Sequence, residues 1–198
     1  MLNSIPAPYV LLDKKHSLKM NRKSIAVDMD NVLVDIEVNW IEAYEEAFGI
    51  RVSREAMLGI PEDQAFPDPL AARSLLYKPG FFRNAPVIAG AQEAILKLQE
   101  HFEIYIVSAA MEFPNSLLEK HDWLGQHFPS IHWRNIVFCG DKSVINTDYL
   151  IDDHLKNLDY CKGTPILFSA SHNAGIDKYR RVNSWAEVLE LFEAEIAK

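Results

Sequence analysis

The chain has 198 residues, enough for one domain with a substantial core or for one domain that carries a small insert. Hydrophobic residues make up 48% and charged residues 24%, a composition that excludes disordered, collagen-like and coiled-coil proteins. The 20 Lys and Arg against 28 Asp and Glu give a net charge of −8, which argues against a nucleic acid polymer as a partner.

Short apolar runs alternate with helical patterns along most of the chain. Residues 1–22 are expected to form a poorly ordered leader, within which Met20 offers a second start for translation. Buried strands are predicted at 24–27, 104–107, 136–138, 149–151 and 165–168, and helices at 91–99, 116–127 and 185–196. This alternation predicts an α/β fold, a three-layer Rossmann-like parallel sheet with right-handed crossovers.

The connection between the first two predicted strands is too long for a single helix. It holds three helix-like segments, at 39–48, 54–58 and 69–76, separated by joints rich in Pro and Gly. We therefore expect a small helical cap at 36–83, inserted into a core made of 23–35 and 84–198.

Polar side chains stand where the predicted strands end. They are four acidic residues, one hydroxyl and one amine: Asp28, Asp30, Asp152, Asp153, Ser108 and Lys142. Because ligands of an open α/β sheet bind beyond the carboxyl ends of its strands, we expect these groups to lie together. An isolated D-x-D is most often a turn or a solvated acidic pair. The functional interpretation therefore depends on the whole series in chain order: an acid pair, a hydroxyl, a lysine and a second acid pair, each after a predicted strand.

This set of side chains fits phosphoryl transfer. Crowded carboxylates raise one another's pKa unless a cation lies among them, and ligands that are all oxygen suit Mg²⁺. Asp28 could attack phosphorus as a nucleophile, while Asp30 could protonate the leaving alcohol and then activate water. Ser108 and Lys142 could hold the phosphoryl oxygens.

Several motifs carry a resemblance to a known family. D-M-D-N-V-L-V-D after a strand, I-V-S, D-K-S and L-I-D-D resemble the four motifs of the haloacid dehalogenase superfamily. P-G-F-F at 79–82, E-K-H-D-W-L at 119–124 and L-F-S-A-S-H-N at 167–173 more narrowly resemble the 5′(3′)-deoxyribonucleotidases. The resemblance covers residues 24–192, nearly everything but the leader.

The resemblance implies a Mg²⁺-dependent phosphatase that hydrolyses (deoxy)ribonucleoside monophosphates through an aspartyl-phosphate. It implies that Asp28 is the phosphorylated nucleophile and that Asp30 is the acid/base, with its backbone carbonyl on the metal. Asp152 and Asp153 would supply the remaining metal ligand, and the sequence leaves open which of them binds directly.

The resemblance also implies the residues around the substrate. Ser108 and Lys142 would hold phosphate, while Ile36, Phe81 and Phe82 would enclose the nucleobase. For Phe82 there is an alternative interpretation, in which its ring does not contact the nucleobase and only packs the cap against the sheet.

Two departures from the family pattern bear on the substrate. Asn31 stands where the family usually has Gly, and Asn tolerates the same unusual backbone angles. After Ser108 the family commonly has Pro and a nearby basic residue, whereas residues 109–112 are Ala-Ala-Met-Glu.

These departures leave two alternative functions open. Another small phosphate ester, such as a sugar phosphate or phosphoglycolate, is the alternative substrate. A non-catalytic phosphate-binding protein is the third hypothesis.

Cysteine usage and hydropathy bear on localisation. Cys139 and Cys161 stand in no disulfide or metal-binding spacing, which is typical of reduced thiols in a cytosolic protein. No stretch reaches the roughly 18 consecutive apolar residues of a membrane span. We expect a cytoplasmic protein that acts on a small molecule, without a membrane partner, and that could form a homodimer.

Among the histidines, His154 is expected to lie nearest the site, because it directly follows the acid pair.

Overall fold

The computed structural model describes residues 22–196 and contains one parallel six-stranded sheet, with the strand order β3-β2-β1-β4-β5-β6. The predicted leader lies outside the described residues except for Arg22, and Met20 also lies outside them. The strands are β1 (Ser24–Val27), β2 (Glu103–Ser108), β3 (Ile136–Phe138), β4 (Tyr149–Asp152), β5 (Thr164–Phe168) and β6 (Arg180–Val182). The parallel α/β sheet confirms the predicted fold class.

The central strand β1 is buried because its residues are apolar on both faces. Ala26 pairs with Tyr105 of β2 on one side and with Leu150 of β4 on the other. Ile25, Ala26 and Val27 have no exposed surface. A continuous apolar run of this kind is expected for a strand covered by helices on both sides.

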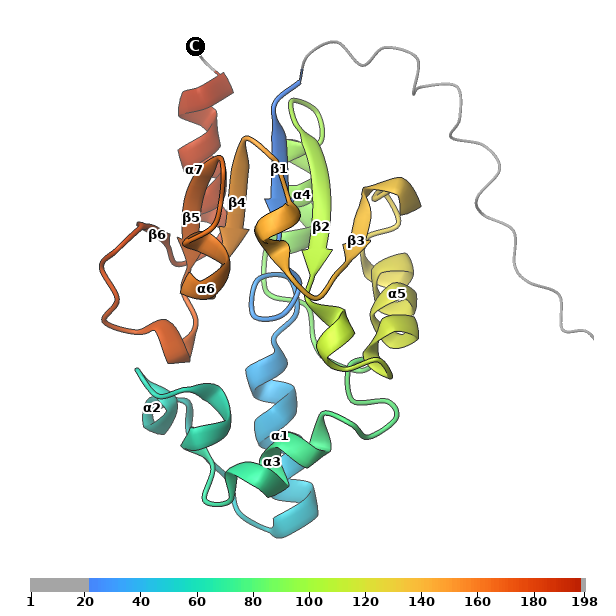
Figure 1. Cartoon of the computed structure of the whole chain (residues 1–198), viewed down its shortest axis with the longest axis vertical. Coiled ribbons are helices and arrows are strands. Elements are labelled where there is room, and N and C mark those ends of the chain that lie inside the picture. The colour runs from blue at the N-terminus through green and yellow to red at the C-terminus, as the bar shows by residue number, and fades with distance from the viewer. Residues whose placement is uncertain (1–21, 197–198) are drawn as a thin grey trace, which may run out of the picture.

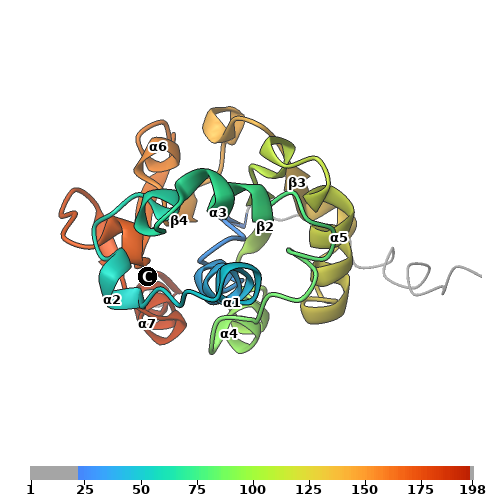
Figure 2. The same cartoon turned by 90° about the horizontal axis from the view of Figure 1, so that it is seen from below.

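Helices cover both faces of this sheet. They are α4 (Ala91–Leu98), α5 (Ser116–His127), α6 (Leu155–Leu158) and α7 (Trp185–Ile196). Figure 2 shows α6 on one side and α4 and α7 on the other. A large core lies under α4, α5 and α7, and a smaller one lies under α6 around Val107, Leu150 and Leu158. The three layers predicted from the alternation of strands and helices are therefore present.

The sixth strand, β6, was not predicted from the sequence. Its three residues, Arg180, Arg181 and Val182, include two arginines, so it lacks the apolar run that marks the other strands. The Arg181 guanidinium donates to the carbonyls of Asn173 and Ile176 at 2.9 and 2.7 Å, which holds this edge of the sheet to the preceding loop.

Three helices lie beyond the carboxyl ends of the strands (Figure 1). They are α1 (Ile36–Phe48), α2 (Arg54–Met57) and α3 (Pro69–Leu75). The Trp40 indole N–H donates to the carbonyl of Ala72 at 2.8 Å, and its ring lies 5.2 Å from that of Phe66, so α1 and α3 pack together. The boundaries of a cap at 36–83 stay a prediction. None of the described helices is long and apolar enough to cross a membrane.

Candidate active site

The loop after β1 brings the first carboxylate to the edge of the sheet. The Asp28 backbone N–H donates to the carbonyl of Ile151 in β4 at 2.9 Å, so the sheet continues to this residue. The chain then turns at Asn31, which has a φ of 55° and donates its N–H to the carbonyl of Val34 at 2.7 Å. Because Asn enters the left-handed region more readily than most residues, the turn forms without glycine.

Lys142 lies buried between two carboxylates. Its Nζ is 2.6 Å from Asp28 Oδ1 and 2.7 Å from Asp152 Oδ2. Burial opposes the charge of this ammonium, but the two carboxylates outweigh burial and raise the pKa of Lys142 above its usual value. Burial also raises the pKa of Asp28 well above its usual value, although Lys142 opposes that rise. The ammonium of Lys142 therefore stays charged beside Asp28.

The two members of the acid pair have different surroundings. Asp152 accepts hydrogen bonds from Lys142, from the backbone N–H of His154 at 2.9 Å and from the amide of Asn157 at 2.9 and 3.1 Å. Asp153 accepts one hydrogen bond on Oδ2, from the Asn31 amide at 3.2 Å. The Asp153 Oδ1 atom is buried and has no hydrogen-bond partner among residues 22–196. Asp153 is thus the member that can offer an oxygen to a further group.

The acidic cluster carries more negative charge than the buried lysine balances. Oxygens of Asp28, Asp152 and Asp153 lie within 4.8 Å of one another, and all three residues are buried. Burial, with Asp152 beside it, raises the pKa of Asp153 to about 7. Since Lys142 neutralises one of these three carboxylates, a divalent cation would balance the other two. This cluster could hold a metal ion.

A second lysine, which the sequence analysis did not single out, joins Asp30 to Ser108. The Lys120 Nζ atom donates to Asp30 Oδ2 at 2.5 Å and to Ser108 Oγ at 3.1 Å. It also lies over the ring of Phe82, 4.7 Å from the centroid. The signal that could have found Lys120 is E-K-H-D-W-L, a motif quoted for the resemblance but not interpreted chemically. Its neighbour Glu119 accepts the backbone N–H of Phe82 at 3.0 Å.

A cavity of about 200 Å³ opens beside these groups. Its lining includes Asp28, Asp30 and Lys142 at the sheet edge and Ile36, Trp40, Arg73, Phe82 and Phe113 above it. Asp153 and Ser108 do not line this cavity. The expected pocket residue Phe81 does not line it either. The Phe81 ring packs edge-on against Phe82 at 5.1 Å, and its carbonyl accepts the Asn39 amide at 2.7 Å.

His154 also lines the cavity and meets an acidic side chain from a distant part of the chain. Its Nε2 lies 3.2 Å from Glu62 Oε1. Burial alone would lower the pKa of His154, but the carboxylates of Asp153 and Glu62 outweigh it and raise this pKa to about 10. Burial alone would raise the pKa of Glu62, but the hydrogen bond and charge of His154 outweigh it and lower this pKa to about 2. Sequence reasoning did not single out Glu62, because no motif surrounds it.

Comparison with known families and curated proteins gives a consistent result. Residues 22–197 match the family described as 5′ nucleotidase, deoxy (pyrimidine), cytosolic type C protein. The chain is 42% identical over 181 residues to a Staphylococcus aureus (strain Mu50) protein named "Putative 5′(3′)-deoxyribonucleotidase", covering 90% of this chain and 100% of that protein. It is 35% identical over 170 residues to the 5′(3′)-deoxyribonucleotidase of Bacillus subtilis (strain 168), covering 84% and 96%.

Solved structures with low sequence identity share the fold. A haloacid dehalogenase-like protein from Agrobacterium tumefaciens superposes with a TM-score of 0.61 at 16% identity, covering 90% of this chain and 100% of that one. A haloacid dehalogenase-like hydrolase from Bacillus subtilis, solved with bound magnesium, superposes with a TM-score of 0.55 at 13% identity, covering 88% and 100%.

Proposed function

The chain belongs to the 5′(3′)-deoxyribonucleotidase family within the haloacid dehalogenase superfamily, and from this premise we propose that it hydrolyses (deoxy)ribonucleoside monophosphates with Mg²⁺. Members of this family are nucleotide phosphatases, so the chain is a phosphoric monoester hydrolase acting on a small nucleotide. The finer proposal concerns the metal, the covalent intermediate and the role of each residue.

One observation carries the proposal: a buried ammonium holds the Asp28 carboxylate in a cavity whose lining also includes three aromatic rings. Lys142 Nζ lies 2.6 Å from Asp28 Oδ1, and the cavity walls include Trp40, Phe82 and Phe113. A phosphate at Asp28 would leave the rest of a nucleotide among these rings. Flat apolar walls suit a nucleobase, whose stacking on one aromatic ring contributes about 1–3 kcal/mol in single-strand binders.

In the proposed reaction an oxygen of Asp28 attacks phosphorus, and the bond from phosphorus to the ester oxygen breaks. The electron pair of that bond goes to the nucleoside oxygen, which takes a proton from Asp30. Lys120 holds Asp30 Oδ2, whereas Asp30 Oδ1 has no hydrogen-bond partner in the described part of the chain, so Oδ1 is the atom that would carry this proton. Asp30 then takes a proton from water as that water attacks the phosphorus of the aspartyl-phosphate, which releases phosphate and restores Asp28.

Ser108 and Lys142 take the phosphate-binding roles in this proposal. The Lys142 ammonium would balance charge on the phosphoryl oxygens as well as on Asp28. The Ser108 hydroxyl accepts a hydrogen bond from Lys120 at 3.1 Å, which leaves its own O–H free to donate to a phosphoryl oxygen.

The residues present fit a magnesium ion. The cluster offers oxygen ligands and has an excess of buried negative charge. It also contains the buried Oδ1 atom of Asp153, which no side chain or backbone group of the described residues contacts by a hydrogen bond. Asp28, Asp153 and the backbone carbonyl of Asp30 would hold the ion, while Asp152 would position Lys142. Bound Mg²⁺ would supply positive charge for the phosphate and keep the buried carboxylates ionised.

We further propose that residues 36–83 form a cap that selects the substrate. Ile36, Trp40, Arg73 and Phe82, all from this segment, line the cavity. Core motifs are shared by enzymes with many substrates, so specificity is expected to depend on this segment.

A substrate panel tests the proposal. Purified full-length protein is assayed for phosphate release from nucleoside 5′- and 3′-monophosphates, sugar phosphates, phosphoglycolate and an aryl phosphate, with Mg²⁺ and with excess EDTA. The expected result is a higher kcat/KM for deoxyribonucleotides, loss of turnover in EDTA and none for Asp28→Asn. A preference for sugar phosphates or phosphoglycolate would overturn the proposal that the substrate is a nucleotide. Full turnover in EDTA would overturn the proposal that the reaction needs Mg²⁺.

A further inference from the structure

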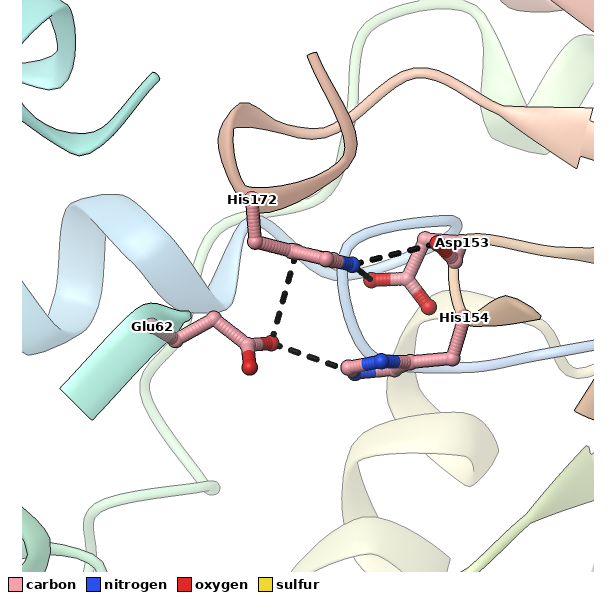
Figure 3. Close-up of side chains that lie close together, drawn as sticks. All are labelled: Glu62, Asp153, His154 and His172. Carbon is pink, nitrogen blue, oxygen red and sulfur yellow. Dashed lines mark hydrogen bonds and ion pairs between the residues drawn. The ribbon is translucent and has the colours of Figure 1, made fainter. Parts of the chain in front are cut away.

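Beside the acidic cluster, three side chains from distant parts of the sequence converge on one point (Figure 3). Glu62 comes from the short 3₁₀ helix η2 (Glu62–Ala65), His154 follows β4, and His172 belongs to η6 (Ser171–Asn173) after β5. Glu62 Oε1 lies 3.2 Å from His154 Nε2 and 3.5 Å from His172 Nδ1. The two imidazole rings stack with centroids 4.3 Å apart.

The surroundings of His172 fix which of its nitrogens carries the hydrogen. Its Nε2 lies 3.1 Å from the backbone carbonyl oxygen of Asp153. A carbonyl oxygen can only accept, so Nε2 carries the hydrogen and donates it, which leaves a lone pair on Nδ1 of a neutral ring. This hydrogen bond therefore points the lone pair of His172 away from Asp153 and toward Glu62.

The Nδ1 atom of His172 is buried without a hydrogen-bond partner among the described residues. The side chain is 9% exposed, so water does not compensate freely for the missing partner. Nδ1 faces Glu62 Oε1, and both atoms are acceptors in this arrangement. Two acceptors held face to face in a buried place are stabilised by a cation between them.

The three ligand atoms suit a transition-metal ion better than Mg²⁺. Two imidazole nitrogens with one carboxylate oxygen form a ligand set used for Zn²⁺, with bonds of about 2.0–2.2 Å. In a tetrahedral site such bonds place neighbouring ligand atoms roughly 3.3–3.5 Å apart, close to the 3.2 and 3.5 Å found around Glu62 Oε1. The hydrogen bond from His172 Nε2 to a backbone carbonyl is the outer support usual for a metal-bound histidine.

We propose that Glu62 Oε1, His154 Nε2 and His172 Nδ1 bind one Zn²⁺ or a similar transition-metal ion, with water completing the site. The two stacked rings, whose planes lie 21° apart, would tilt on binding so that both lone pairs point at the ion. The ion would replace the proton that His154 shares with Glu62 and release it to solvent. It would tie η2 to the loops after β4 and β5, next to the cavity that contains Asp28. This site is separate from the Mg²⁺ site proposed above, because the carboxylate of Asp153 is not one of its ligands.

The test measures metal binding directly and does not depend on the proposed reaction. The full chain is stripped with chelator, dialysed, saturated with Mg²⁺ to fill the acidic cluster, and titrated with Zn²⁺ by calorimetry. A parallel titration with Co²⁺ follows the visible absorption that reports its coordination. Glu62→Gln and His172→Asn remove ligands, whereas Asp28→Asn alters only the acidic cluster and His121→Asn removes an exposed histidine outside the site.

The expected result is one Zn²⁺ per chain in the presence of excess Mg²⁺. Glu62→Gln and His172→Asn should weaken this binding by at least about 10-fold, while Asp28→Asn and His121→Asn should leave it unchanged. Saturating Zn²⁺ should also raise the melting temperature of the wild type, since a ligand of the folded state stabilises it. A Cys139→Ser, Cys161→Ser double variant should bind like the wild type.

Three results would overturn the proposal: no Zn²⁺ binding once Mg²⁺ is present, loss of binding in Asp28→Asn, or binding that survives Glu62→Gln. The side chain of Glu62 is 25% exposed, so Glu62→Gln should fold even if the buried His172→Asn does not. Circular dichroism of each variant without metal checks the fold.

Discussion

Replacing Asp153 with Asn should stabilise the metal-free protein at neutral and alkaline pH. Burial, with Asp152 beside it, raises the pKa of this carboxyl from 3.8 to about 7 in the folded state. Between these values the folded protein holds a proton that the unfolded chain has lost, so stability falls as pH rises through this window. At about 1.4 kcal/mol per pKa unit, the loss approaches about 4 kcal/mol above pH 7. An Asn side chain cannot ionise and avoids this loss.

The variant Asp152→Asn is a matched control, for which we expect a loss of stability instead of a gain. Asp152 is as buried as Asp153, with 0% and 1% of the respective residues exposed, but it accepts hydrogen bonds from Lys142 and Asn157. Asp152→Asn removes one charged partner of the buried Lys142. Breaking a buried ion pair typically costs about 3–5 kcal/mol, so this variant should be less stable than the wild type.

Urea unfolding at pH 5 and pH 8, first in EDTA and then in excess MgCl₂, measures both effects. In EDTA the difference in unfolding free energy between Asp153→Asn and the wild type should grow in favour of the variant from pH 5 to pH 8. Added Mg²⁺ should stabilise the wild type and have little effect on Asp153→Asn, which lacks the free carboxylate oxygen. Two results would contradict the proposal that Asp153 binds the metal while Asp152 positions Lys142. One is that Asp153→Asn loses stability at pH 8 as Asp152→Asn does, and the other is that Mg²⁺ stabilises Asp153→Asn as much as the wild type.

Three further predictions concern single side chains. Asp28→Asn should abolish phosphate release, whereas Asp30→Asn should slow it by about 10²–10⁴; near wild-type turnover in Asp28→Asn would exclude a covalent intermediate. Phe82→Ala should lower kcat/KM for deoxyribonucleotides by roughly 10-fold or more while sparing a small aryl phosphate, and equal loss on both would make Phe82 a packing residue. Asn31→Ala should lower the free energy of unfolding by about 1–2 kcal/mol through its positive φ, as chemical denaturation would show, with Asn31→Gly as the conformational control.

The parts of the site that could be predicted from sequence are those that the sheet itself positions. Asp28, Ser108 and Asp152 each stand at the carboxyl end of a strand marked by a short apolar run, and parallel strands bring such ends to one edge. The positions of these residues relative to the strands were therefore enough to place them together. The same logic failed for β6, because the pairing of Arg180–Val182 with β5 depends on backbone bonds and not on an apolar pattern.

The distinction between Asp152 and Asp153 could not be predicted, because it depends on side chains that reach the pair from elsewhere. Asn157, five residues downstream, and Lys142, ten residues upstream, both bind Asp152. Asn31 binds Asp153 from a position 122 residues away. Asp152 is the last residue of β4, whereas Asp153 follows the strand in a bend, so the two carboxylates meet different neighbours. Only the folded chain shows which neighbours those are.

Lys120 and Glu62 show why local sequence motifs do not predict contacts between distant segments. Lys120 reaches Asp30 across 90 positions of sequence, and Glu62 meets His154 from a segment without any motif of its own. Each of these side chains places a charge opposite one delivered by a strand end. The strand ends thus supply the carboxylates, while side chains from other segments, namely Lys120, Lys142 and Asn157, decide which carboxylate oxygens are already occupied. Within residues 22–196, the buried carboxylate oxygens left without a hydrogen-bond partner are Asp153 Oδ1 and Asp30 Oδ1, the two atoms on which the proposed metal and acid roles depend.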